Sequence, residues 1–408
     1  MGRGTQFWTR ISLLNLLIVA VLGLLMRYKI GFDFPYLNQK HLQFAHYHFA
    51  FYGWISQTLM VLMVHSLRQA SSIVDPSRYN RIFICNMVGS YGMLAAFLAD
   101  GYGVPALVSS GVSVAAAIWF TIYFLTDQRK AGKSDVASKW FRAGLCFNML
   151  STLGTLALGY MMLTKNIHQN EYLASVYFFL HFQYNGWFFF ACMGLFMDFI
   201  HARGKAYITA FRLFLLSCVP TYFLSVLWLD LPTWLYGIVV LGAFLQLYAW
   251  VLVARQVIKD GIHPSNSGVR YILRYILVFA GVALTIKLLL QAGSTIPAVS
   301  KLAFGFRPVV IAYLHLVLLA VITLFLLFYI FAAEVFPATR KIILGLLLFS
   351  SAVFVNELIL AVQGIAAFSY TPVRFVNELL LFAAILLFAG IAAIWRHSLK
   401  KSQNKWRV

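Results

Sequence analysis

Long apolar segments separated by short polar stretches recur along the whole chain. Each segment approaches the roughly 20 residues that a helix needs to cross the hydrocarbon core of a bilayer. The pattern therefore predicts an all-α, polytopic membrane bundle of about twelve transmembrane helices. The predicted spans are residues 10–27, 44–66, 81–100, 104–126, 140–163, 172–197, 209–228, 233–254, 271–291, 308–332, 341–362 and 375–395.

The stretches between these spans predict how the chain is oriented. No polar stretch is long enough for an inserted soluble domain, so we expect a single transmembrane domain over residues 1–408. If the N-terminus lies inside, most of the 32 lysine and arginine residues fall in inner segments, as the positive-inside rule requires. We expect a multi-pass protein of the bacterial inner membrane with both termini in the cytoplasm. The first apolar segment is expected to stay uncleaved, because Arg27 and Lys29 follow it directly.

Composition supports a membrane location. Hydrophobic residues make up 62% of the chain and charged residues 11%, whereas soluble domains are roughly half apolar and a quarter charged. The formal net charge of +20 comes from residues between apolar segments, which favours contact with anionic lipid and argues against nucleic acid as a partner. The cysteines lie inside apolar segments without a CxxC pair, so they predict neither a disulfide scaffold nor covalently attached haem.

Four histidines lie well inside predicted spans, where such residues are costly and usually functional. They are His46, His48, His181 and His315. All occur early in spans that run from outside to inside, so at about 1.5 Å per residue they reach a similar depth in the outer leaflet. Neutral imidazoles at matched depth on different helices can ligate one metal or one haem iron.

His46 and His48 cannot both face the same ligand. Two residues along a helix correspond to about 200° of rotation. At most one of the pair can bind a given iron, and the other would serve a second site or a structural hydrogen bond.

Three motifs around these histidines resemble subunit I of the haem–copper oxidases and nitric oxide reductases. They are HYHFAFYGW at residues 46–54, HFQYNGW at 181–187 and YLH at 313–315. Twelve helices and cytoplasmic termini are also typical of that family. A looser resemblance exists to the twelve-helix haem- and copper-containing membrane proteins of the nitrosative-stress response.

The resemblance implies a role for each matched residue. His48 and His315 would be the axial ligands of a low-spin haem b, and His48 is preferred to His46 because the residues after it align better. His181 would match the first ligand of a second metal, copper or iron. Tyr313 would stand where the family has the proximal ligand of the high-spin haem.

Two departures put oxygen chemistry in doubt. Residues 209–228 contain no histidine, although the corresponding family helix supplies two, and Asn185 stands where the reductases carry an acidic residue. The resemblance therefore implies a degenerate relative without a complete binuclear centre, rather than a working terminal oxidase.

Charged residues near the outer ends of the later spans have two interpretations each. Arg307 is the preferred partner for haem propionates, although it would equally well snorkel to the interface. Glu357 would handle protons or form an ion pair with Lys287.

The predicted function is that of a b-type haem-binding membrane protein, for electron transfer or redox chemistry of nitric oxide or oxygen. The electron donor is left open between a quinol and a cytochrome, and partner subunits are also left open. One alternative is a cofactor-free secondary transporter with twelve helices. Another is an assembly or sensory protein that takes up haem or copper transiently.

Overall fold

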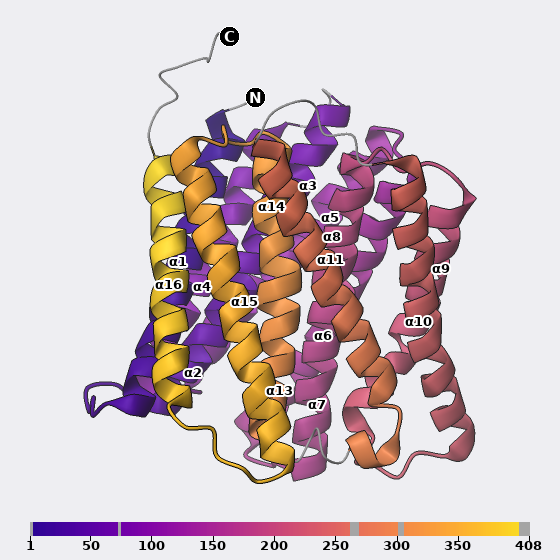
Figure 1. Ribbon diagram of the computed structural model, residues 1–408. Coiled ribbons are helices and arrows are strands. Elements are labelled where there is room, and N and C mark those ends of the chain that lie inside the picture. The colour runs from indigo at the N-terminus through magenta and orange to yellow at the C-terminus, as the bar shows by residue number, and fades with distance from the viewer. Residues whose placement is uncertain (1–2, 72–74, 262–268, 301–305, 400–408) are drawn as a thin grey trace.

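The computed structural model describes residues 3–71, 75–261, 269–300 and 306–399, which form helices joined by short connections (Figure 1). The first half contains α1 (Arg3–Gly31), α2 (Gln39–His48), η1 (Phe49–Ser56), α3 (Gln57–Ala70), α4 (Pro76–Asp100), α5 (Val104–Lys130), α6 (Val136–Thr164), α7 (Gln169–His181), η2 (Phe182–Phe188) and α8 (Phe189–Phe199). The second half contains α9 (Lys205–Cys218), η3 (Pro220–Val226), α10 (Thr233–Asp260), α11 (Val269–Gly293), α13 (Arg307–His315), η4 (Leu316–Thr323), α14 (Leu324–Ala332), α15 (Arg340–Phe368) and α16 (Val376–Ser398).

The protein is a polytopic helical membrane bundle. Nine helices in the described ranges are long and apolar enough to cross a bilayer. A tenth span arises if α9 and η3, which meet at an angle of 43°, are taken together. The other two predicted spans fall on the continuous helical runs α2–η1–α3 and α7–η2–α8, which are not among these candidates.

Helix ends follow the local sequence. Asn38, Asp75 and Asp135 each cap the helix that follows, because the side chain accepts a hydrogen bond from a free backbone N–H of the first turn. The turn between α4 and α5 contains Gly101 with a φ of 65°, a conformation that suits glycine. Within each helix the backbone groups bond to one another, as the bilayer requires.

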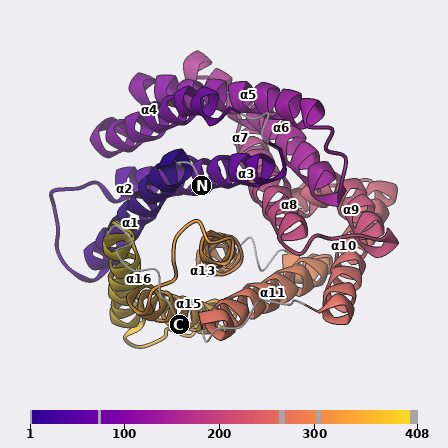
Figure 2. The same cartoon turned by 90° about the horizontal axis from the view of Figure 1, so that it is seen from above.

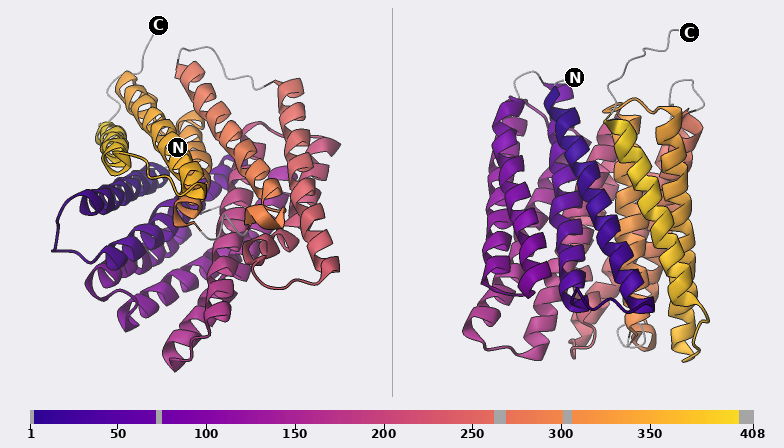
Figure 3. Two further views of the ribbon diagram at one scale, coloured as in Figure 1. Left: turned by 60° about the horizontal axis from the view of Figure 1, so that its bottom comes forward. Right: turned by 90° about the vertical axis from the view of Figure 1, so that its left-hand side faces the viewer.

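The first and last helices lie side by side, with both chain ends on the same face of the bundle (Figure 3). Arg10 on α1 donates from Nε to the Ser398 carbonyl oxygen at 2.9 Å. Gln6 also donates to the Val335 carbonyl oxygen at 3.1 Å, at the end of α14. These bonds join the two ends of the sequence at one membrane face.

Three of the helical runs change from α to π geometry directly after a histidine. Segment η1 follows His48, η2 follows His181 and η4 follows His315. π-helical turns are uncommon and occur frequently at functional sites. The three motifs singled out in the sequence therefore share one backbone feature.

Two tryptophans connect the π-helical segments to one another. The Trp54 indole on η1 donates to the Thr323 hydroxyl on η4 at 3.0 Å, and Trp187 on η2 donates to the Ser56 hydroxyl on η1 at 3.2 Å. A glycine precedes each tryptophan in the sequence, and at each glycine a neighbouring side chain packs closely against the backbone. A Cβ on Gly53 would lie 2.8 Å from the Phe49 ring.

The second glycine of this kind is Gly186, where a Cβ would lie 2.6 Å from Cβ of Phe147. The two Gly-Trp pairs therefore have one physical role. The glycine permits close packing, and the indole reaches across to the next helix.

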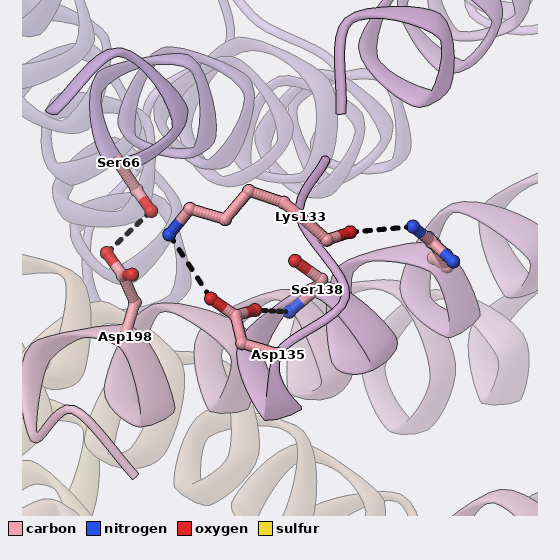
Figure 4. A network of polar contacts seen from close by, with 6 residues as sticks. Ser66, Lys133, Asp135, Ser138 and Asp198 are labelled. Atoms are coloured by element: carbon pink, nitrogen blue, oxygen red, sulfur yellow. Dashed lines mark hydrogen bonds and ion pairs between the residues drawn. The ribbon is translucent and has the colours of Figure 1, made fainter. Parts of the chain in front are cut away.

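A polar cluster lies at the membrane face that carries both chain ends (Figure 4). Lys133 pairs with Asp135 at 3.2 Å, and Asp135 accepts a bond from the Ser138 N–H at 2.8 Å. Ser66 on α3 donates to Asp198 on α8 at 2.6 Å. Partial burial opposes ionisation of Asp135, but its bonds from Ser138 and Lys133 outweigh this and hold its pKa below the ordinary value.

Replacing Trp54 with Phe should lower stability by about 1–2 kcal/mol, because one hydrogen bond and part of a packed ring are lost in the membrane interior. The midpoint of thermal unfolding in detergent measures this effect. Trp234→Phe is the matched control, since Trp234 is 67% exposed. Equal shifts for the two variants would contradict a role for the Trp54–Thr323 bond.

Asp135→Asn should lower stability at neutral pH by less than about 1 kcal/mol, because the pair with Lys133 is partly exposed. The carboxylate has a lowered pKa in the folded state, so its contribution is present above the unfolded value of about 3.9 and is lost as pH falls. Thermal melts of wild type and variant should therefore converge towards acid pH. Asp33→Asn, at an exposed position, serves as the control; a constant gap at all pH values would refute this prediction.

Candidate functional site

Helix α13 lies near the centre of the bundle when it is seen along the helix axes (Figure 2). His315 ends this helix, and its Nδ1 lies 2.9 Å from the Ile311 carbonyl oxygen. A carbonyl can only accept, so Nδ1 carries the proton and Nε2 keeps its lone pair. This is the arrangement in which a backbone carbonyl orients a ligating imidazole.

His46 lies against α1 and close to His315. A Cβ on Gly23 would lie 3.3 Å from Cε1 of His46, so only glycine leaves the ring this position without a shift. His46 is within electrostatic range of both His315 and Arg27. The Val19 backbone approaches the ring, but the buried Nδ1 forms no hydrogen bond of normal geometry within the described structure.

His48 faces another direction. Its Nε2 bonds to the Tyr102 hydroxyl at 3.0 Å, and its ring stacks on Phe97 with centroids 4.4 Å apart. Both contacts come from α4 and the turn that follows it. The resemblance prefers His48 as the partner of His315. In the structure, His46 lies within electrostatic range of His315, and His48 contacts Phe97 and Tyr102.

One arginine interacts with His46 and His315, and a second lies at the start of α13. Arg27 on α1 interacts electrostatically with both imidazoles. Arg307 donates to the Gln43 side chain at 3.0 Å, which connects the start of α13 to α2 one turn before His46. The single ion pair found among the described residues is Lys133–Asp135, so neither arginine has a carboxylate partner there.

His181 uses both ring nitrogens within the protein. Its Nε2 lies 2.8 Å from the Cys218 carbonyl oxygen and must donate to it, so Nδ1 accepts from the Asn185 amide at 3.1 Å. No lone pair is left for a metal in this arrangement. Across the ranges that the structure describes, no group of three or more His, Cys, Asp or Glu side chains is placed to hold a metal ion.

Lys287 is buried beside this site, at 5% exposure, and does not pair with Glu357. Its ammonium donates to the Gln291 side chain at 2.6 Å. Gln291 donates to Gln246 at 2.8 Å, and Gln246 donates to Thr221 at 3.0 Å. A chain of hydrogen bonds thus runs from the ammonium through the two amides to the Thr221 hydroxyl. The interpretation of Lys287 and Glu357 as an ion pair is not supported.

A cavity of about 780 Å³ lies on the opposite side of α13 from His315. Its described walls come from α7, η2, η3, α11, α13, η4 and α15, without a contribution from α1 or α2. Tyr313 lines it, two residues from His315 and hence about 200° around the helix. His181, Asn185 and Glu357 line it as well. Helix α13 therefore separates a histidine pair from a cavity.

Neither a protein-family model nor a curated protein matches this chain.

Sequence reasoning missed Arg27 and Gly23. In the sequence Arg27 is only a polar residue that flanks the first apolar segment, yet in the structure it interacts electrostatically with both histidines. A signal was available: a basic residue near the outer end of the first helix lies at the level predicted for the histidines. The closeness of Gly23 to His46 depends on how α1 and α2 pack, which a linear pattern does not contain.

Proposed function

We propose that this chain is a b-type haem-binding membrane protein in which His46 and His315 hold the iron and pass electrons. The observation that carries the proposal is that these imidazoles, on α2 and α13, lie within electrostatic range of each other. His315 has a fixed tautomer with a free Nε2, and His46 has a buried nitrogen without a hydrogen bond. Arg27 interacts electrostatically with both imidazoles and has no carboxylate partner among the described residues. Haem propionates need such cations, because buried carboxylates without partners are costly.

The ligand set favours electron transfer. Iron with two imidazole ligands is coordinatively saturated, so it exchanges electrons without binding a gas. Gas chemistry would need a second metal at His181, whose two nitrogens bond within the protein. A high-spin haem held by Tyr313 would occupy a cavity whose described lining includes no lysine or arginine for its propionates.

The wider proposal is a twelve-span bundle related to subunit I of the haem–copper oxidases. Support comes from α2–η1–α3 and α7–η2–α8, each a continuous helical run that carries one of the motifs. Chain ends on one face, together with the basic inner segments, favour cytoplasmic termini in a bacterial inner membrane. The electron donor would be a quinol or a cytochrome.

The test is a pyridine haemochrome assay and a reduced-minus-oxidised spectrum of the purified protein. His46→Ala and His315→Ala should each abolish the sharp low-spin bands, because each removes one axial ligand. His48→Ala is the matched control, two residues away on the same helix, and should keep them. Loss with His48→Ala and retention with His46→Ala would restore the choice made from sequence.

A colourless protein after haem-replete expression would end the proposal. The cofactor-free transporter would then be the better hypothesis, and substrate uptake by the reconstituted protein would be its test. Haem well below one per chain in the purified protein would favour a transient assembly or sensory role.

Arg27→Met should lower the midpoint potential of the haem by roughly tens of millivolts, because nearby positive charge favours the reduced iron. A spectroscopic redox titration measures the shift. Lys29→Met is the control, since the Lys29 ammonium is held by the Phe34 carbonyl oxygen. An unchanged potential with Arg27→Met would show that Arg27 does not face the iron.

A further inference from the structure

Glu357 is a carboxyl group at the wall of the cavity, and no cation pairs with it within the ranges that the structure describes. It lies on α15 and accepts a hydrogen bond from the Asn356 side chain at 3.1 Å. No Lys, Arg or His in the described part of the chain forms an ion pair with it. A carboxyl group at membrane depth is costly and usually serves a ligand or a pathway.

Aromatic rings surround the same space. Tyr184 and Tyr313 meet edge to face with centroids 6.4 Å apart, and Phe279 and Phe354 do so at 6.2 Å. All four side chains line the cavity. Ring faces attract cations, and the attraction grows when water is excluded.

The wall of the cavity on α11 and α15 contains side chains that are not covered by other residues. Among them are Val282, which is 52% exposed, Leu358 at 54% and Ile365 at 69%. Figure 1 shows α11 and α15 diverging towards the lower end of the view, with α13 behind them. A ligand dissolved in lipid would therefore enter between these two helices.

The charged residues around the cavity indicate which charge a bound ligand should carry. Within the described structure, no lysine or arginine lines the cavity. Lys287 lies behind the wall, where its ammonium bonds to Gln291. An anionic amphiphile would face Glu357 without a counter-ion. A cationic ligand would instead interact favourably with the Glu357 carboxylate and with aromatic ring faces, at the α15 side of the cavity.

We propose that the cavity is a binding site for amphipathic organic cations, which enter from the bilayer between α11 and α15 and pair with Glu357. The site is separate from the proposed haem site, because His46 and His315 do not line it. Its size falls within the range of roughly 300–1,000 Å³ that is typical of ligand pockets.

The experiment is equilibrium dialysis of the purified full-length protein, in neutral detergent, against tetraphenylphosphonium. Tetraphenylborate, which has nearly the same shape and the opposite charge, separates charge recognition from simple partition. Glu357→Gln should weaken tetraphenylphosphonium binding by about tenfold or more, as expected when a partly desolvated charge pair is lost. Glu357→Asp should retain part of the affinity.

The chain supplies its own matched control for Glu357. The sequence Phe-Val-Asn-Glu-Leu occurs at both 354–358 and 375–379, and the second copy places Glu378 at an exposed position in the first turn of α16, outside the cavity. Glu378→Gln should bind tetraphenylphosphonium like the wild type. Size-exclusion profiles and haem spectra of the variants report whether the fold is intact.

Three results would overturn the proposal. They are equal binding of the phosphonium and the borate, equal losses with Glu357→Gln and Glu378→Gln, and exclusion of the phosphonium by a second haem per chain. The dialysis does not depend on haem, and the haem assay does not depend on Glu357. Failure of one proposal is therefore distinguishable from failure of the other.

Discussion

Two indole hydrogen bonds hold together the three helices that carry the motifs. In a bilayer the hydrophobic effect does not drive helices together, so close packing and interhelical hydrogen bonds decide their association. Trp54 joins η1 to η4, and Trp187 joins η2 to η1. Each of the two tryptophans follows a histidine of its motif by a few residues along the chain. The positions of His46, His181 and His315 relative to one another depend on these contacts.

The π-helical segments give the same positions a second constraint. A π turn inserts an extra residue and so rotates the histidine before it relative to the helix after it. In all three runs the histidine lies directly at this change. The chain thus orients the histidine end of each run separately from the long apolar part that crosses the membrane.

Helix α13 divides the interior by charge. On one side, His315 lies within electrostatic range of His46 and Arg27, and Arg307 at the start of the helix bonds to Gln43 on α2. On the other, Tyr313 faces a cavity whose described lining contains a carboxyl group and no lysine or arginine. Cations beside the histidines suit an anionic porphyrin, and the carboxyl group suits a cationic ligand. The two proposed sites therefore differ in chemistry although one helix serves both.

The apolar pattern by itself determined that this is a polytopic helical membrane protein, because a bilayer forces long uncharged segments into helices. It also predicted where helices begin, as at 104, where Val104 starts α5 after a glycine turn. Only the tertiary structure shows that His46 lies within electrostatic range of His315 while His48 stacks on Phe97, since both contacts depend on the rotation of α2 against its neighbours. The same holds for Lys287, which bonds to Gln291 rather than Glu357. Side-chain partners on different helices depend on how the helices pack, and the spacing of residues along one helix does not determine that packing.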